Sequence, residues 1–354
     1  MNKQIVLLVC YCFLSVYCCR WFKDITISAK DKENRSFNQT INSCIERVAF
    51  GGQTAKEIYV RHQAITSLGK DSVRNLIWLQ TISFWGCPIV HITSKLFRNV
   101  PRLKNVQISY GNVKEIPRGA FEELPAMELL RIHNNQIDVI EDLAFANLVS
   151  LKSIQADSNK LEHWNREWFT NTTKLEIMNF QNNKIRTIPR RAFASLTNLR
   201  QIHFDHNEIS IIHENAFEGI EYLVYLGLRS NRLKEIKLDM FPNQIRIKSL
   251  LLDSNYLNFL ANEVLNKISA KDVTLDNNPW KCPCLDRIAY WVYKNNGTIR
   301  ASSECAGGRI PVCAYPSTFS QTCLEHVDED VTKKYLKNLK SLDPPLPEYC
   351  VLPD

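Results

Sequence analysis

The sequence predicts an α/β solenoid, in which short repeats stack a parallel sheet along one face. Three observations predict this fold. Apolar residues recur with a period of 24 residues over most of the chain, an Asn recurs at one place in that period, and a group of cysteines follows the last repeat. With 354 residues, of which 45% are hydrophobic and 23% charged, the chain is expected to fold. The period favours one long repeat array over several ordinary domains.

The repeat is clearest in the middle of the chain. From Leu151, apolar residues stand at positions 1, 4, 6, 11, 14 and 19 and an Asn at position 9, and the pattern returns from Leu175, Leu199 and Leu223. Ten units begin at residues 55, 79, 103, 127, 151, 175, 199, 223, 247 and 270. Positions 4 and 6 alternate inward on a short strand, so positions 3, 5 and 7 face outward.

This spacing, L-x-x-L-x-L-x-x-N-x-L, resembles that of leucine-rich repeat proteins over residues 55–281. The resemblance implies a horseshoe with a parallel sheet on its concave face and a disulfide-bonded C-terminal cap. The Asn at position 9 is expected to bond backbone groups that would otherwise be buried unpaired. Gln63, Cys87 and Gly111 take its place in the first three units.

The N-terminal residues predict export. Lys3 precedes an apolar stretch over residues 5–16, so residues 1–18 are expected to be a signal peptide, with cleavage after Cys18 or Cys19 both open. Twelve cysteines and no further apolar span indicate a secreted, extracellular protein without a membrane span or lipid anchor. Four sequons predict glycosylation, at Asn34, Asn38, Asn171 and Asn296.

The cap after the last repeat is expected over residues 282–323. It resembles the cysteine-rich C-terminal flanking domain of extracellular leucine-rich repeat proteins, which implies the pairs Cys282–Cys305 and Cys284–Cys323. Two further cysteines, Cys313 and Cys350, either bond each other and strap the tail to the cap, which we favour, or link two chains.

The N-terminal cap, residues 19–54, lacks the C-x-x-C of many relatives. Cleavage after Cys18 would let Cys19 bond Cys44. Cleavage after Cys19 would leave Cys44 unpaired or force it onto Cys87, which we otherwise expect to be a buried thiol.

The tail, residues 324–354, contains a predicted helix over 327–342 with Val331, Tyr335, Leu339 and Leu342 on one face, followed by a Pro-rich end. Two interpretations stay open: a helix docked on the cap, or a tail that binds a partner or forms a dimer.

Function is expected on the outward face of the sheet. Exposed aromatic residues and Arg are enriched in protein interfaces. The candidate ligand-binding residues are Tyr59, Arg61, Trp85, Tyr110, Arg131, His133, Asp157, His203, Asp205, Tyr225, Arg229 and Asp253. His203, Asp205 and His206 lie close enough in the repeat to hold a divalent metal or form a pH-sensitive contact, but we predict no metal site and no cofactor.

No catalytic motif of a hydrolase, kinase, zinc protease or deaminase is present, so the chain is not expected to be an enzyme. The net charge of +7, without a clustered basic run, argues against a nucleic-acid partner. The expected function is binding of an extracellular protein or glycoprotein in recognition or signalling. The layout is similar to that of secreted invertebrate immune leucine-rich repeat proteins, although their usual long coiled coil is missing. Two alternatives are a structural matrix or adhesion component, and an inhibitor or carrier acting through the C-terminal cap.

Overall fold

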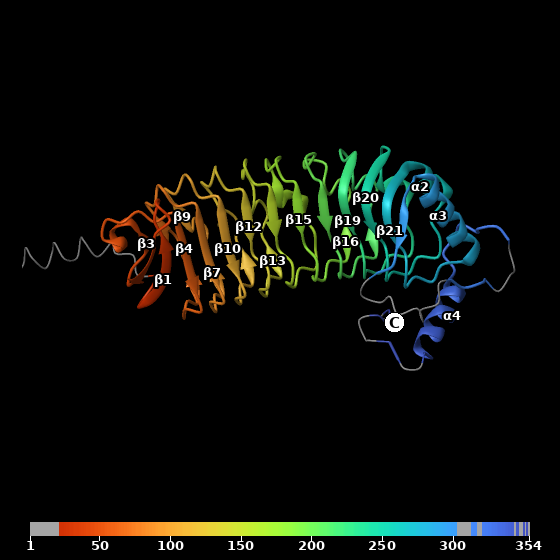
Figure 1. Ribbon diagram of the computed structural model, residues 1–354, viewed down its shortest axis with the longest axis horizontal. Coiled ribbons are helices and arrows are strands. Elements are labelled where there is room, and N and C mark those ends of the chain that lie inside the picture. Colours follow the sequence, from red (N-terminus) through yellow and green to blue (C-terminus); the bar gives the residue numbers. More distant parts are fainter. Residues whose placement is uncertain are drawn as a thin grey trace, which may run out of the picture. The chain divides into compact units, whose positions relative to one another are not determined.

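The structure, a computed structural model, describes residues 21–302, 313–316, 321–342, 345–346, 350 and 352 (Figure 1). Two compact units are distinguished, residues 1–151 (unit 1) and 152–354 (unit 2), and each is described by itself. The predicted signal peptide, Cys19 and Cys305 lie outside the described residues.

Unit 1 begins with a hairpin of two antiparallel strands, β1 (Ile25–Lys30) and β2 (Ser36–Ile41). On its other side, β1 pairs antiparallel with the first repeat strand, β4 (Glu57–Arg61). Alternate residues of β1 are buried, as expected for a strand with one face on the core. The hairpin therefore covers the end of the repeat array, which a solenoid needs to hide its terminal core.

The repeats of unit 1 each contribute one parallel strand to the sheet. After β4 come β7 (Thr81–Trp85), β10 (Asn105–Ser109) and β12 (Leu129–Arg131), paired in that order. Residues 24 apart in sequence are partners, so the same repeat position recurs along a straight row. The returning segments form 3-10 helix η1 (Arg47–Phe50) and the short strands β3 (Ile45–Glu46), β5 (Ser67–Leu68), β6 (Val73–Arg74), β8 (His91–Ile92), β9 (Phe97–Arg98), β11 (Glu115–Ile116) and β13 (Val139–Ile140).

Unit 2 repeats this plan. Its parallel strands, in spatial order, are β14 (Ser153–Gln155), β15 (Ile177–Asn179), β17 (Gln201–His203), β19 (Tyr222–Gly227), β20 (Ile245–Leu251), β21 (Ile268–Thr274) and β22 (Thr298–Arg300). Its returning segments are η2 (Arg166–Phe169), β16 (Thr187–Ile188), β18 (Ile211–Ile212), η3 (Leu238–Met240) and α2 (Asn262–Lys267). These stacked repeats confirm the predicted solenoid with a parallel sheet.

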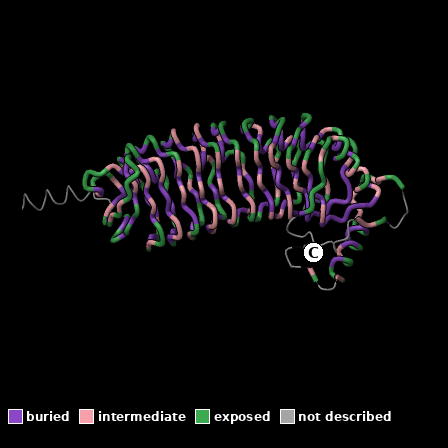
Figure 2. The backbone as a smooth tube through the Cα atoms, viewed as in Figure 1, coloured by how far each residue is buried: buried purple, intermediate pink, exposed green. Residues whose placement is uncertain are grey.

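The core follows the predicted positions. Figure 2 shows buried and more exposed residues alternating along the strands. The Phe residues at position 19 stack behind the sheet of unit 2, with 5.4 Å between the ring centroids of Phe193 and Phe217 and 4.8 Å between those of Phe217 and Phe241. Each buried side chain of this size contributes roughly 1.5–3 kcal/mol of burial free energy. A single repeat could not enclose these rings, so their stacking joins neighbouring repeats into one core.

The Asn at position 9 has the expected role. In unit 2, Asn207 Nδ2 donates to the carbonyl oxygens of Phe180 and Phe204, at 3.0 and 3.1 Å, and its Oδ1 accepts from the Ile185 amide at 3.0 Å. Asn231 makes the same three bonds one repeat later. Each Asn therefore bonds two carbonyls and one amide of adjoining turns, which a hydrophobic residue could not do.

Position 8 of every repeat has a left-handed backbone. The residues there, all with φ between 51° and 64°, are His62, Gly86, Tyr110, Asn134, Ser158, Asn182, His206, Ser230, Ser254 and Asn277. Gly and Asn adopt this region readily, whereas it costs a bulky residue roughly 1–2 kcal/mol. The turn therefore favours small polar residues, and His62 and Tyr110 in unit 1 depart from that preference.

The C-terminal cap begins with α3 (Cys282–Lys294), and one implied disulfide pairing is wrong. Cys284 bonds Cys323, as expected, but Cys282 bonds Cys313 rather than Cys305, with a Cα–Cα distance of 5.0 Å. The pairing is consistent with the backbone, because Cys282 N donates to the carbonyl of Ala314 and so brings Cys313 alongside the first turn of α3.

The predictions for the remaining cysteines have different outcomes. The favoured Cys313–Cys350 strap is excluded by the Cys282–Cys313 bond, although Cys350 is itself disulfide-bonded. Cys44 is also disulfide-bonded, while Cys87 is a buried free thiol, so the Cys44–Cys87 alternative does not occur.

The tail helix α4 (Glu329–Lys340) is docked on unit 2. Its apolar face, Val331, Tyr335 and Leu339, is buried, and the last two pack with Tyr256 and Leu352. The helix starts at Asp328, whose side chain accepts from the amides of Asp330 and Val331. The apolar face of α4, which from the sequence could have bound a partner, thus packs on a repeat of the same chain.

Candidate functional site

The open face, defined as the side of the sheet that carries repeat positions 3, 5 and 7, presents the candidate residues in two separate sets. Unit 1 holds Tyr59, Arg61, Trp85, Tyr110, Arg131 and His133. Unit 2 holds Asp157, His203, Asp205, Tyr225, Arg229 and Asp253. Each set is therefore considered as a site of its own.

Four rings of unit 1 form a continuous row that we call the aromatic ladder: His62, Trp85, Tyr110 and His133. The centroids of His62 and Trp85 are 4.7 Å apart, those of Trp85 and Tyr110 5.2 Å, and those of Tyr110 and His133 5.4 Å. The first and last pairs meet edge to face, at 85° and 75°. Such contacts fix ring orientation, because the positive edge of one ring meets the negative face of the next.

Two of the four rings of the ladder are exposed, whereas Trp85 and His133 are half-buried. Tyr110 is 49% exposed, and His62 is exposed as well. Both stand at the left-handed position 8, where most other repeats have Asn or Ser. Two aromatic residues at strained backbone positions are not required by the repeat, and local strain of this kind concentrates at binding sites.

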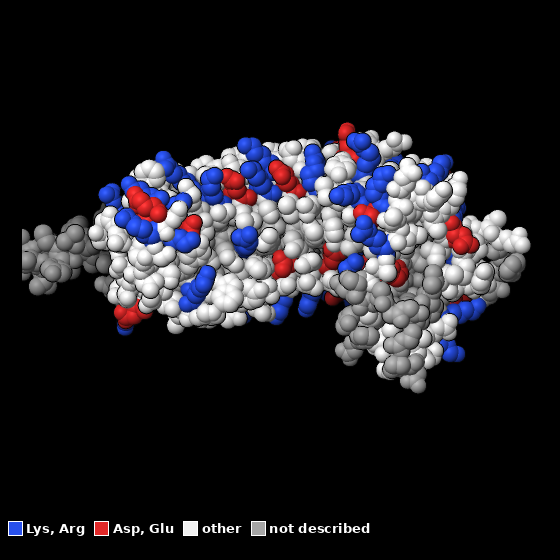
Figure 3. Space-filling view, viewed as in Figure 1, with Lys and Arg blue, Asp and Glu red and all other residues white. Residues whose placement is uncertain are grey.

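Beside the ladder lies a shallow depression, lined by Tyr59, Arg61, His62, Ser83, Trp85 and Gln107. The Arg61 guanidinium lies over the Tyr59 ring, 5.5 Å from its centroid. The Tyr59 hydroxyl is fixed by donation to Glu57 Oε2 at 2.8 Å, and burial raises the pKa of that hydroxyl. In Figure 3 the middle of the visible surface of unit 1 is mostly uncharged, with Lys and Arg mainly toward its edges.

Arg131 and His133, the remaining candidates of unit 1, are half-buried. His133 extends the ladder, and its Nδ1 lies 3.2 Å from Asn134 Nδ2. The candidate residues named from the sequence include neither His62 nor Gly86. The missed signal was the contrast between the aromatic residues at position 8 and the Asn or Ser usual there.

The set in unit 2 centres on a stacked pair of rings over a buried carboxylate. The rings of His203 and Tyr225 lie 4.1 Å apart and are inclined by only 21°. Tyr225 Oη donates to Asp205 Oδ2 at 3.1 Å, and the Arg229 amide donates to Asp205 Oδ1 at 3.2 Å. Burial raises the pKa of Asp205 to about 6 and lowers that of His203 to about 4.

Gly227 makes this arrangement possible. It occupies position 5 of its repeat, where a Cβ would fall on the carboxylate of Asp205. The carboxylate can therefore turn inward beneath Tyr225, and Asp205 is only 4% exposed. Asp205 thus holds Tyr225 in place from beneath, and direct contact of Asp205 with a ligand stays a prediction.

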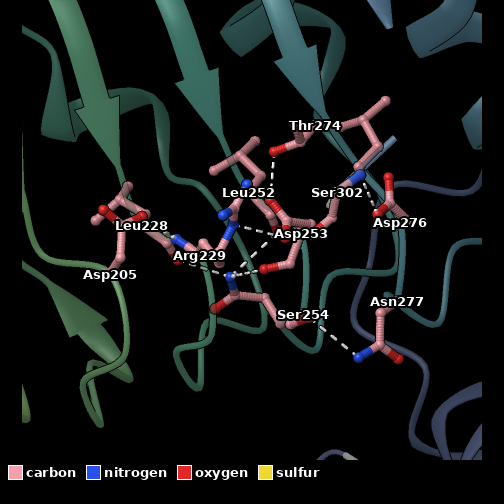
Figure 4. A network of polar contacts seen from close by, with 12 residues as sticks. Asp205, Leu228, Arg229, Leu252, Asp253, Ser254, Thr274, Asp276, Asn277 and Ser302 are labelled. Carbon is pink, nitrogen blue, oxygen red and sulfur yellow. Dashed lines mark hydrogen bonds and ion pairs between the residues drawn. The ribbon is translucent and has the colours of Figure 1, made fainter. Parts of the chain in front are cut away.

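A second buried carboxylate follows along the sheet (Figure 4). Asp253, fully buried, forms an ion pair with Arg229, whose Nε lies 2.9 Å from Asp253 Oδ2, and accepts a hydrogen bond from the Thr274 hydroxyl. Further along, the Ser302 amide donates to Asp276 Oδ2, and Asn277 donates to the Ser254 hydroxyl oxygen at 3.1 Å. Asn277 also donates to the carbonyl of Cys350. Asp253 therefore pairs within the protein, and its assignment as a ligand-binding residue stays a prediction.

Asp157 is half-buried and accepts from Asn179 Nδ2 at 3.1 Å. Within the described part of the chain, no group of three or more His, Cys, Asp or Glu side chains is arranged to hold a metal ion. The sequons at Asn34, Asn38, Asn171 and Asn296 are all exposed, so glycosylation there stays a prediction with accessible acceptors.

The repeats match a known family model. The model of the BspA type leucine rich repeat region matches residues 17–152, 114–248 and 187–283. The chain belongs to this leucine-rich repeat family. No curated protein matches this leucine-rich repeat chain.

Solved structures share the leucine-rich repeat fold. The Drosophila Toll–Spatzle complex matches with a TM-score of 0.62 and 20% identity, over 79% of this chain and 42% of the matched chain. The mouse RP105/MD-1 complex matches with 0.57 and 21%, over 70% and 42%. Human 5T4, titled Wnt-activated inhibitory factor 1 or trophoblast glycoprotein, matches with 0.50 and 18%, over 79% and 92%. The chain thus spans less than half of the matched Toll and RP105 chains. In the described residues, no helix has the length and apolar character needed to cross a membrane.

Proposed function

We propose that this leucine-rich repeat protein is a secreted recognition component that binds a protein or glycoprotein partner through the open face of unit 1. The observation that carries the proposal is the aromatic ladder. Trp and Tyr dominate the binding energy of protein interfaces. Here Tyr110 is exposed and Trp85 half-buried, the two rings contact each other, and Tyr110 stands on strained backbone. A ligand meeting them would lose little side-chain entropy, because the rings are already ordered.

Two further features support this function. The disulfides of the cap and the exposed sequons fit an oxidising, extracellular compartment. Two of the similar structures, Toll–Spatzle and RP105/MD-1, are complexes. An open face without an enclosing cleft also fits binding of a large surface better than catalysis, which needs water to be excluded. A role in immunity is one setting for such recognition.

A photo-reactive amino acid in place of Trp85 tests the proposal. The secreted protein is cross-linked in extracellular fluid, and partners are identified by mass spectrometry. The matched control carries the same label at Trp78, which is exposed in the same unit but packs against Arg102 outside the open face. We expect a saturable partner at residue 85 alone, and its loss by tenfold or more in a Trp85→Ala, Tyr110→Ala double variant. Equal labelling from both positions would contradict the proposal.

One observation favours a second candidate, contact through the cap. Tyr290 and Tyr293, one turn apart on α3, are 65% and 78% exposed. An inhibitor or carrier acting through the cap would use these rings. In that case Tyr290→Ala, Tyr293→Ala would abolish partner capture, and the ladder variant would retain it.

A further inference from the structure

Arg61 carries a charge that the protein leaves available. Its side chain is exposed, and among the described residues it makes no ion pair, only the stacking contact with Tyr59. Two other arginines of unit 1 are neutralised: Arg74 pairs with Glu46 at 3.0 Å and Arg98 with Asp71 at 3.4 Å. Arg61 therefore presents a fixed guanidinium beside the depression.

The carboxylate on the strand of Arg61 already has partners within the protein. Glu57, on the same strand, pairs with Lys30 Nζ at 3.0 Å and accepts from the Tyr59 hydroxyl. These two partners hold the pKa of Glu57 below its usual value, against the opposing effect of burial. Glu57 is therefore ionised at neutral pH and balanced by Lys30. The open face of β4, β7 and β10 is left with the positive charge of Arg61 beside the ladder.

The depression has a polar floor and an aromatic wall. Ser83 Oγ donates to Gln107 Oε1 at 3.1 Å, and no described residue accepts from Gln107 Nε2, so that amide can donate to a ligand. Trp85 and His62 form the wall. A ligand that fits has an apolar ring for the wall, oxygen acceptors for Gln107 and a carboxylate for Arg61.

From this geometry we infer, resting on the proposed function, that unit 1 selects an acidic segment of its protein partner in which a carboxylate side chain pairs with Arg61 and a neighbouring aromatic side chain packs against Trp85. Two subsites with different chemistry make the selection specific. The charge excludes basic segments, and the ring excludes polyanions that lack an aromatic group. The guanidinium fork favours the planar carboxylate, with which it can form two parallel hydrogen bonds.

The test measures binding of the full-length secreted protein, immobilised at physiological ionic strength, to four probes: a copolymer of Glu and Tyr, poly-Glu, a copolymer of Lys and Tyr, and heparin. We expect the Glu–Tyr copolymer to bind at least about tenfold more tightly than poly-Glu or heparin, and the Lys–Tyr copolymer not to bind. Arg61→Gln should weaken the Glu–Tyr copolymer about tenfold or more. The matched Arg102→Gln, which removes an arginine stacked on Trp78 at 4.1 Å, should leave binding unchanged.

A charge-reversal variant distinguishes a loss of the specific contact from a loss of binding through misfolding. Arg61→Glu should lose the Glu–Tyr copolymer and gain the Lys–Tyr copolymer, which an unfolded variant would not do. The inference is overturned if the Glu–Tyr copolymer does not bind, if heparin binds as well, or if Arg102→Gln has the effect of Arg61→Gln. A different outcome is that cross-linking at residue 85 captures a partner that the Arg61→Glu variant binds as tightly as the unmodified protein does. That result would show that the partner is not selected through an acidic segment, while the proposed function would stand.

Discussion

Gly86 lies against the ring of His62 so closely that a Cβ at residue 86 would be 2.7 Å from the imidazole. The absence of a side chain at this place lets His62 approach Trp85 edge to face. One glycine, directly after strand β7, thereby sets the start of the aromatic ladder.

Replacing Gly86 with Ala is expected to displace His62. Gly51 supplies the control, because it has a similar φ of 57° but nothing within 4 Å of an added Cβ. Gly51→Ala should cost only the backbone strain, roughly 1–2 kcal/mol. Gly86→Ala should cost about 1–3 kcal/mol more through overpacking, and it should also reduce partner capture. Urea unfolding of both variants measures the difference, and equal destabilisation would show that Gly86 does not position His62.

Replacing Tyr110 with Asn is expected to separate binding from stability. Relief of strain at φ 58° is worth about 1 kcal/mol, and the lost ring contacts cost about 0.5–1.5 kcal/mol. The free energy of unfolding should thus stay within about 1 kcal/mol of the original, while partner capture falls tenfold or more. His206→Asn, a change at the same repeat position in unit 2, should leave capture intact. If Tyr110→Asn retained full capture, the ladder would not be the binding centre.

His203 and Asp205 are expected to contribute two opposite pH dependences to the free energy of unfolding. The pKa of Asp205 is about 6 in the folded state against an ordinary value of 3.8. The native state therefore holds more protons between these values, and its stability falls as pH rises from about 4 to 6. The pKa of His203 is about 4 against 6.5, so here the unfolded state holds more protons and stability rises over nearly the same range.

Replacing either residue alone should expose the pH dependence of stability that is due to the other. The Asp205 effect is about 3 kcal/mol and that of the less buried His203 about 2 kcal/mol, so in the unmodified protein they largely cancel. Relative to that protein, His203→Gln should lose stability as pH rises from 4 to 6, and Asp205→Asn should gain it. Denaturant unfolding at several pH values provides the measurement, with the exposed-site variant Asp138→Asn as the reference. Slopes of the same sign in the two variants would refute the assignment.

Lys281 is expected to anchor the tail. Its buried ammonium group donates to the carbonyls of Leu324 and His326, at 3.0 and 2.8 Å. Lys281→Met leaves both carbonyls without that donor and should cost about 2–5 kcal/mol of docking free energy. We expect α4 to become sensitive to limited proteolysis, whereas Lys294→Met, at the exposed end of α3, should not change the cleavage pattern. An unchanged pattern for Lys281→Met would mean that the apolar face of α4 suffices.

The fold could be predicted from the sequence because its rules are local and periodic. Position 9 needs an amide that both donates and accepts, and position 19 needs a large apolar ring, so Asn207 and Phe193 report their environments directly. The period-2 alternation likewise placed Trp85 and Tyr59 on the open face, where the structure has them.

The parts that could not be predicted depend on contacts without a period. Cys282 pairs with Cys313 because the chain returns beside α3, and no spacing rule encodes that return. Asp205 and Asp253 occupy outward positions of the repeat, yet both are buried. The first turns beneath Tyr225 in the space left by Gly227, and the second pairs with Arg229. Repeat position gives the direction of a side chain, but its neighbours decide whether solvent reaches it.

Cys87 stands where most repeats have the Asn, and burial raises the pKa of its thiol. A thiol reagent can reach it only when the turns of unit 1 separate, because its Sγ lies 3.7 Å from the Val60 carbonyl inside the stack. The rate of alkylation at Cys87 is consequently a built-in gauge of how often this part of the solenoid opens, readable without any engineered label.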